Sequence, residues 1–153
     1  DPSIGSSSAN PYVRARVARH GLLALAKEEA VYFTASRDSR GDKLSEDCIY
    51  ELTGGQQDAD WWSITLYNND SRLPMNDDDA LSIDATKTAG RETWSAIISA
   101  ERPDNAAAWI SSRSAGIFDL TLRLYRPSLA VLDDPERAIH APSVIRKSCG
   151  AST

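Results

Sequence analysis

FDLTLRLYRP, which spans residues 118–127, is the most regular stretch of the sequence. Apolar and polar side chains alternate along it, and this period of two is typical of a β-strand with one buried face. A run this regular fixes the register of the strand, because a slip by one residue would turn every apolar side chain to water. We expect the following side chains to face the core: Phe118, Leu120, Leu122 and Leu124.

Shorter runs of the same kind precede and follow this strand. Residues 61–67 are the clearest of them, with Trp62, Ile64 and Leu66 on the apolar face. The first two runs, 31–35 and 48–53, are expected to pair as a hairpin with a long connection. Seven or eight short strands separated by turns predict a mainly β fold, a jelly-roll-like antiparallel sandwich. The other predicted strands lie near residues 81–85, 93–99, 109–112 and 144–147.

The N-terminal part of the chain has a different pattern. Residues 1–9 are rich in serine and are predicted to form a flexible segment. Asn10 and Pro11 are typical of a helix N-cap followed by proline in the first turn, so one N-terminal helix is predicted to about residue 20. Residues 10–153 are expected to form a single β-rich domain, since 153 residues is an ordinary domain size.

Composition excludes several classes of partner. The formal net charge is −5, whereas a nucleic-acid-binding domain needs an excess of basic residues to displace counterions. No apolar run approaches the roughly 20 residues of a membrane-spanning helix, so we expect no membrane span in this chain. The sequence opens at Asp1 rather than at methionine, which is compatible with a removed signal peptide or N-terminal anchor.

Neither a metal nor a cofactor is predicted. The chain has no phosphate-binding loop, no dinucleotide fingerprint and no His-Glu-x-x-His motif. His20 is expected to lie at the end of the predicted helix and His140 in a loop, with no third ligand nearby. Residues 77–79 are three consecutive aspartates, and a solvated acidic loop is favoured over a cation site because neighbouring side chains point in different directions.

Two cysteines, Cys48 and Cys149, leave two interpretations open. They can be unrelated buried thiols, or they can form one disulfide between the middle of the chain and its end. Both lie beside strand-like segments and polar residues rather than inside apolar runs, which favours the disulfide.

Aromatic and arginine side chains concentrate on the predicted strands. Tyr67, Arg123 and Tyr125 share the polar phase of their strands, while Trp109 and Arg113 lie on or beside another. If that phase lines a cavity, these five residues form a ligand site with a π surface, hydroxyl groups and a fixed cation, suited to a carboxylate or a sugar. If it faces water, they are ordinary cross-strand pairs.

The two clearest strands also carry a family resemblance. Trp62-Ser63-Ile64-Thr65-Leu66-Tyr67 and the stretch 118–127 resemble the two strand motifs of a bacterial family known as domain of unknown function 1214. The similarity covers about residues 10–150. Relatives often carry Asn-Trp-Leu-Pro where this chain has Ala108-Trp109-Ile110-Ser111, so only Trp109 corresponds.

The resemblance implies a jelly-roll-like fold and a place among single-domain envelope proteins, periplasmic or anchored facing the periplasm. It strengthens the expectation of the Cys48–Cys149 disulfide and assigns no reaction. The favoured function is therefore an uncharacterised exported domain that binds an unknown small molecule, polymer or envelope protein on a polar sheet face. The alternatives are a hydrolase-like enzyme, which would use Asp119 or Glu101 with Arg113 or Arg123, and a purely structural module.

Overall fold

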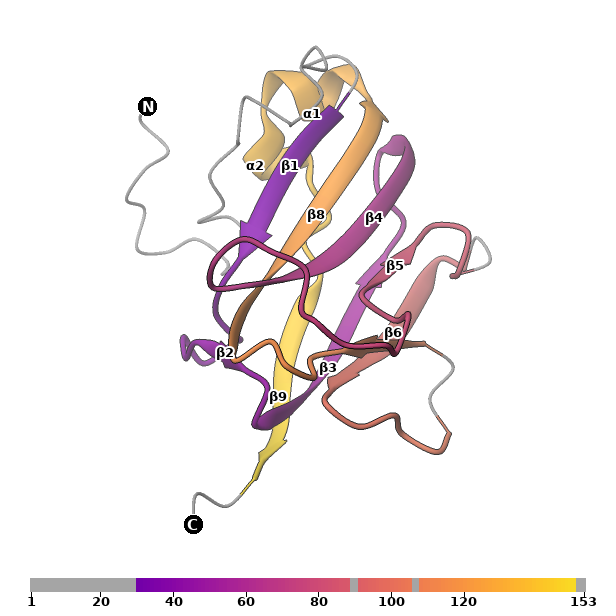
Figure 1. Ribbon diagram of the computed structural model, residues 1–153. Coiled ribbons are helices and arrows are strands. Elements are labelled where there is room, and N and C mark those ends of the chain that lie inside the picture. The colour runs from indigo at the N-terminus through magenta and orange to yellow at the C-terminus, as the bar shows by residue number, and fades with distance from the viewer. Residues whose placement is uncertain (1–29, 89–90, 106–107, 151–153) are drawn as a thin grey trace.

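The computed structural model describes residues 30–88, 91–105 and 108–150. The described chain is mainly β, with two short helices, and its strands form two sheets (Figure 1). The predicted N-terminal helix and the predicted flexible segment both lie outside the described residues. The elements are β1 (Ala30–Ala35), β2 (Leu44–Ser45), β3 (Cys48–Gly55), β4 (Ala59–Asn68), β5 (Ser82–Asp84), β6 (Thr93–Ser99), β7 (Trp109–Ser111), β8 (Ile117–Pro127), α1 (Leu129–Asp133), α2 (Pro135–Ala138) and β9 (Ser143–Cys149).

The strands divide into two sheets whose order differs from the chain order. The first sheet runs β1-β8-β4-β5, and β2 also pairs with β8; the second runs β7-β6-β3-β9. All pairs are antiparallel except β6 with β7. The predicted mainly β fold is confirmed, and the finer jelly-roll topology stays a prediction.

The predicted hairpin between the first two strands is wrong. β1 pairs with β8, whereas β3 pairs with β6 and β9 in the other sheet. The connection between them carries the chain from one sheet to the other, so the two strands cover the core from opposite sides. Alternation along a strand shows which of its faces is buried. It does not show which other strand pairs with it.

The core lies between the inner faces of the sheets. Phe118, Leu120, Leu122 and Leu124 are fully buried, as predicted, and so are Ile64 and Leu66 from β4. The central strand β8 pairs with β1 on one side and β4 on the other, so its apolar side chains meet neighbours in both directions. Between the sheets, the rings of Trp62 and Trp94 stack with centroids 5.1 Å apart.

The loop between β1 and β2 is held by a buried carboxylate. Asp38 is fully buried, and its Oδ1 accepts hydrogen bonds from the backbone N–H groups of Arg40 and Asp42. Its Oδ2 lies 3.7 Å from Nε of Arg146, whose Nη2 also pairs with Asp42 at 3.0 Å. Arg146 belongs to β9, so this ion-pair cluster fastens the loop to the second sheet.

Cys48 and Cys149 form a disulfide, and the predicted pairing is confirmed. The two residues are direct partners in the register of β3 and β9, and 101 positions of sequence separate them. The bridge therefore fixes the final strand to a strand from the middle of the chain.

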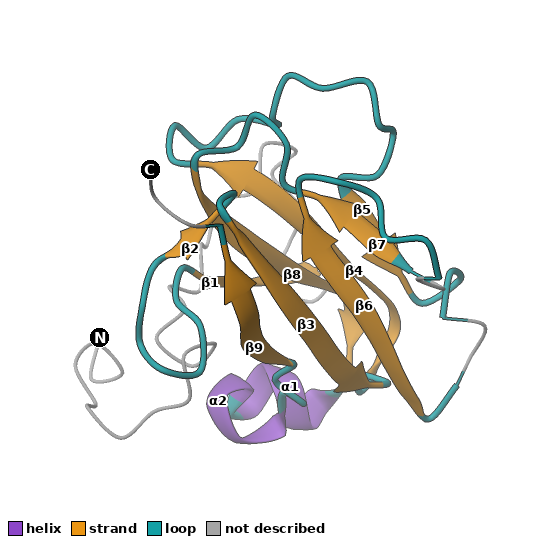
Figure 2. Cartoon of the chain, turned by 90° about the horizontal axis from the view of Figure 1, so that it is seen from below, coloured by secondary structure: helices purple, strands orange, loops and turns teal. Residues whose placement is uncertain are grey.

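Two short helices follow β8 and were not predicted from the sequence. Ser128 caps α1, since its Oγ accepts a hydrogen bond from the N–H of Val131. The helices pack beside each other at one end of the strands (Figures 1 and 2). In the part of the chain that the structure describes, no helix is long and apolar enough to cross a membrane.

Gly54→Ala is expected to lower the free energy of unfolding by about 1–3 kcal/mol, because it overfills the core. A Cβ at this position would lie 2.7 Å from Cζ2 of Trp94, and that ring is held by its stacking on Trp62. Denaturant titration measures the change. Gly150→Ala is the matched control, because its Cβ would meet the carbonyl oxygen of Asp47 at 3.5 Å, an ordinary contact. Equal losses in the two variants would contradict this packing.

Candidate functional site

The outer face of the first sheet, here called the polar sheet face, carries the polar phases of β1, β8 and β4. These side chains point away from the core because successive residues of a strand alternate between faces. Strand register arranges them in four rows across the sheet. The rows are Trp61 with Tyr125; Tyr32, Ser63 and Arg123; Thr34, Thr65 and Thr121; and Tyr67 with Asp119.

Arg123 occupies the middle of the polar sheet face. Its Nη2 donates a hydrogen bond to the hydroxyl of Tyr67, and its Nη1 donates to Oγ1 of Thr65 at 3.3 Å. Its Cζ lies 5.5 Å from the ring centroid of Tyr32 and 5.4 Å from that of Tyr67. Both distances are within the range of a cation–π interaction. Three side chains from β1 and β4 therefore fix the orientation of a half-buried guanidinium.

Arg123 belongs to none of the ion pairs within residues 30–88, 91–105 and 108–150. Its neighbour on the opposite phase, Arg126, does pair with Asp60 at 3.1 Å. A guanidinium carries five N–H donors, and the described contacts of Arg123 are to neutral hydroxyl and aromatic groups. The positive charge of Arg123 is therefore not neutralised by any acidic side chain among its described contacts.

Trp61 and Tyr125 form an aromatic pair at one end of the polar sheet face. They are direct partners in the register of β4 and β8, with ring centroids 5.3 Å apart and ring planes at 55°. Trp61 is 36% exposed, which is high for so large an apolar side chain on a strand. Its indole N–H lies 3.4 Å from Oγ1 of Thr86. The pair offers an accessible aromatic surface beside Arg123.

Asp119 lies at the opposite end of the polar sheet face, in the row of Tyr67. It is half-buried, and this burial raises the pKa of its carboxyl above the ordinary value of 3.8. Between Asp119 and the aromatic pair lie the hydroxyl groups of Thr34 and Thr121, whose Oγ1 atoms are 3.4 Å apart. The face thus combines an aromatic surface, a cation, hydroxyl groups and a carboxyl in one line along β8.

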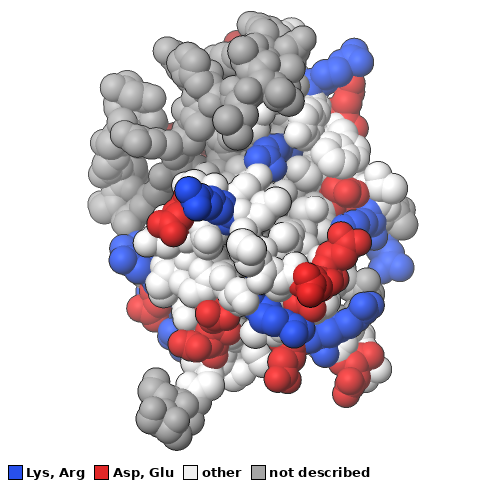
Figure 3. All heavy atoms as spheres, in the orientation of Figure 1, with Lys and Arg blue, Asp and Glu red and all other residues white. Residues whose placement is uncertain are grey.

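The surface over the first sheet agrees with this description. Figure 3, in the orientation of Figure 1, shows mostly uncharged side chains over the middle of this sheet, with most of the acidic and basic side chains below and beside them. A charge on the polar sheet face, surrounded by uncharged side chains, is screened less by other charges than one among the acidic and basic side chains at the edge.

The five residues predicted to bind a ligand occupy two places. Tyr67, Arg123 and Tyr125 lie on the polar sheet face, and Tyr67 and Arg123 are in contact. Trp109 belongs to β7 in the second sheet, where its Nε1 donates to the carbonyl oxygen of Ser99 at 3.1 Å. Arg113 follows β7. The ligand role of all five stays a prediction, but the structure brings only three of them onto one face.

Arg113 instead holds the acidic loop between β4 and β5. Its Nη2 pairs with Oδ1 of Asp78 at 2.9 Å, and Oδ2 of Asp78 accepts a hydrogen bond from Ser111 at 2.6 Å. Within the described residues, no group of three or more histidine, cysteine or acidic side chains is arranged to hold a metal ion. His140 meets Gln57 through its backbone N–H and carbonyl groups.

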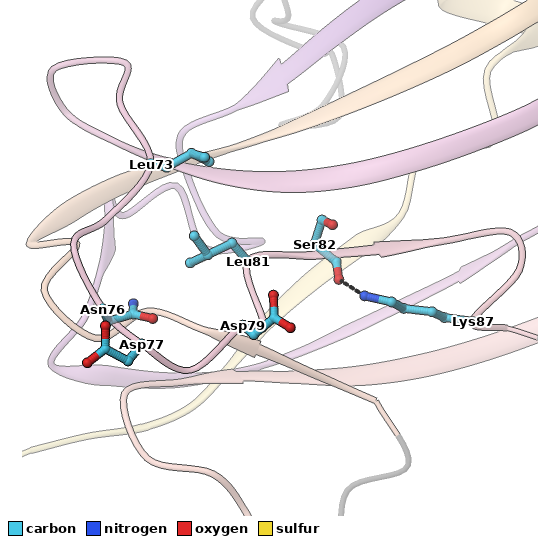
Figure 4. Close-up of a pocket in the computed structure, with 7 residues that line it drawn as sticks. All are labelled: Leu73, Asn76, Asp77, Asp79, Leu81, Ser82 and Lys87. Atoms are coloured by element: carbon cyan, nitrogen blue, oxygen red, sulfur yellow. Dashed lines mark hydrogen bonds between the residues drawn. The ribbon is translucent and has the colours of Figure 1, made fainter.

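A pocket of about 390 Å³ opens beside this loop (Figure 4). Two of its polar side chains bind the backbone outside this loop: Lys87 donates to the carbonyl oxygen of Ser82 in β5 at 2.8 Å, and Asn76 donates to that of Arg113 at 2.7 Å. None of the five predicted ligand residues lines it. The lining residues are Leu73, Asn76, Asp77, Asp79, Leu81, Ser82 and Lys87.

Sequence reasoning left out Tyr32, one of the residues that orient Arg123. Tyr32 shares the polar phase of β1 and Thr65 that of β4, so alternation placed both on an outer face. The pairing of β1 with β8, which brings Tyr32 beside Arg123, spans a sequence separation of about 90 residues and leaves no local signal. Regular alternation in both strands was the only available indication.

Asp119→Asn is expected to stabilise the fold at neutral pH and to lose this advantage in acid. A carboxyl whose pKa is raised by folding binds its proton more tightly in the folded state, so wild-type stability falls as pH rises from below 3.8 through the raised pKa. The asparagine variant lacks this fall. Denaturant titrations across this range, with the exposed Asp70→Asn as control, measure it. A difference from the wild type that is independent of pH would contradict the assignment.

Comparison with known proteins agrees with the fold and with the motifs. The described chain is a two-sheet β domain with a polar outer face that carries a fixed arginine. It belongs to the family described as "Protein of unknown function (DUF1214)", which matches residues 29–129. No curated protein matches the chain.

Two solved structures share the fold. The VPA0106 protein from Vibrio parahaemolyticus superposes with a TM-score of 0.70 at 22% identity, covering 84% of this chain and 33% of that protein. An uncharacterized protein from Burkholderia cenocepacia superposes with a TM-score of 0.54 at 15% identity, covering 76% of this chain and 30% of that protein. The chain thus spans about a third of the length of each.

Proposed function

We propose that this domain binds a ligand with an anionic group on the polar sheet face, and that Arg123 recognises that group. The observation that carries the proposal is the half-buried guanidinium, fixed by Tyr32, Thr65 and Tyr67 without an acidic partner among the described residues. Partial burial of a cation costs hydration, and a carboxylate ligand restores the lost interactions through two parallel N–H···O bonds.

Rigid placement supports the same conclusion. The binding groups lie on β1, β4 and β8, whose backbones are joined by continuous ladders, rather than on loops. A side chain that is already oriented loses little conformational entropy when a ligand arrives. The proposal extends to location: the domain works in the periplasm, free or anchored to the membrane, where a structural disulfide such as Cys48–Cys149 persists. The ligand is a small molecule, a polymer or a group displayed by an envelope protein.

The test is a thermal-shift and calorimetric screen of carboxylate ligands against three proteins: the wild type, Arg123→Gln and Arg126→Gln. Arg126 is the matched control, because it lies on the same strand and its exposed side chain pairs with Asp60. We expect an anionic ligand to stabilise the wild type and Arg126→Gln, and to bind Arg123→Gln at least about tenfold more weakly, since charge-assisted hydrogen bonds are lost. Equal binding by all three proteins would refute the proposal.

A second candidate function, hydrolysis by a carboxyl group, is favoured by one observation. A general acid needs a raised pKa, and burial raises the pKa of Asp119 on the same face as Arg123. In that case the bound ligand is cleaved, and Asp119→Asn binds it without turnover. Release of product by the wild type, followed by chromatography, separates an enzyme from a binding domain. A structural module would bind no ligand in either assay.

A further inference from the structure

We infer further that the ligand is an extended acidic oligosaccharide, bound lengthwise along β8. This inference rests on the proposed function and names the class of ligand that the polar sheet face takes. It follows from the order of chemical groups along that face, from the aromatic pair through Arg123 and the threonines to Asp119.

The spacing of the groups requires a long ligand. The four rows of the polar sheet face are two residues apart along β8, from Tyr125 to Asp119. At 3.2–3.4 Å per residue, the outermost rows are roughly 20 Å apart. One small carboxylate can meet Arg123 but cannot also reach Trp61 and Asp119. A chain of several units can meet all of them at once.

The chemistry of each row suits a sugar unit. The aromatic pair of Trp61, which is exposed, and Tyr125, which is partly buried, offers an apolar surface with polar edges, against which the C–H face of a pyranose ring packs. The hydroxyl groups of Thr34, Thr121 and Tyr67 both donate and accept hydrogen bonds, as sugar hydroxyls do. Arg123 adds the charge that selects an acidic unit. Neutral glycans lack the group that this guanidinium binds.

An acidic peptide fits this face less well. Extended peptides are usually bound by adding a strand to a free sheet edge, where backbone groups remain unpaired. β8 is paired with β1 on one side and with β4 on the other, so its backbone groups are already used. Recognition on the polar sheet face must therefore come from side chains alone. Nucleic acid is disfavoured by the net charge of −5.

Calorimetric titration of the intact domain with galacturonic acid and with its α-1,4-linked tetramer tests the inference. We expect the tetramer to bind the wild type at least about tenfold more tightly than the monomer, because a monomer held by Arg123 fills about one row, whereas the tetramer also covers the aromatic pair and the threonines. Trp61→Ala should remove that gain and leave monomer binding within about twofold, and Trp61→Phe should restore part of it by replacing the ring. Arg123→Gln should weaken both ligands.

Each outcome separates this inference from the proposal on which it rests. If the monomer and the tetramer bind with equal affinity and both need Arg123, the oligosaccharide inference is overturned and the proposed anion site stands. Stronger binding of the tetramer that Trp61→Ala leaves unchanged would also overturn it, because the ligand would then not lie along β8. If neither galacturonic acid nor its tetramer binds, the oligosaccharide inference is overturned. If no carboxylate in the wider screen binds either, the proposed anion site is overturned as well.

Discussion

Removal of the disulfide by the double substitution Cys48→Ala and Cys149→Ala is expected to lower the free energy of unfolding by about 2–5 kcal/mol. The bridge spans 101 positions of sequence, so it restricts the unfolded chain strongly. The loop-entropy estimate for such a length is about 4.7 kcal/mol, an upper figure, because residual structure in the unfolded chain reduces it. The loss of protection should be greatest in β9, whose only pairing partner among the described strands is β3.

Denaturant titrations of the wild type and the double variant measure this effect. Hydrogen exchange locates it, and we expect the amides of β9 to lose more protection than those of β8. A reducing agent should move the wild type to the stability of the variant and leave the variant unchanged. A difference below about 0.5 kcal/mol between the two proteins would show that strand pairing alone secures the C-terminal strand.

Leu122→Ala is expected to cost about 2–5 kcal/mol, as a large-to-small change in a core that cannot fully collapse. Leu122 is fully buried in the central strand, directly opposite Phe33 of β1 and Ile64 of β4. Both neighbours are anchored in the same ladder, so neither can move far into the space left. Leu129→Ala is the matched control, because Leu129 is 77% exposed in α1. A loss below about 0.5 kcal/mol for Leu122→Ala would show that β8 faces the core with its other phase.

Burial could be predicted from the sequence wherever alternation was regular. All eight predicted strands are present within a few residues, since β-branched and aromatic side chains separated by turn residues leave a local signal. The apolar phase of residues 118–124 gave the core face of β8 correctly. The two residues Cys48 and Cys149 could be paired because no other cysteine competes for either of them.

Strand order could not be predicted in the same way. Which strands become neighbours depends on contacts between distant residues, so the partners of β1 and β3 were assigned wrongly. α1 and α2 were missed because their five and four residues are too few to show a helical period. Their formation depends on the Ser128 cap and on packing at the end of the sheets.

The candidate site was likewise predictable only in part. Tyr67, Arg123 and Tyr125 were placed correctly on one face because they share a phase on strands that prove to be neighbours. Trp109 and Arg113 were added because of their residue types, although nothing in the sequence related their strand to β8. Trp109 contacts Ser99 of the neighbouring strand β6, and Arg113 pairs with Asp78 of the loop between β4 and β5. The residue types indicated which chemical groups a site would need, but only the strand register showed which of these residues share a face.

The most direct test of the binding face is a map of backbone amide chemical-shift changes as an acidic oligosaccharide is added to the labelled domain. If the polar sheet face is the site, the changes will concentrate in β8 and β4, centred on Arg123, Tyr67 and Trp61, and Arg123→Gln will abolish them. Changes centred on the pocket residues Leu73, Asp77 and Lys87, or changes that persist in Arg123→Gln, would contradict the account.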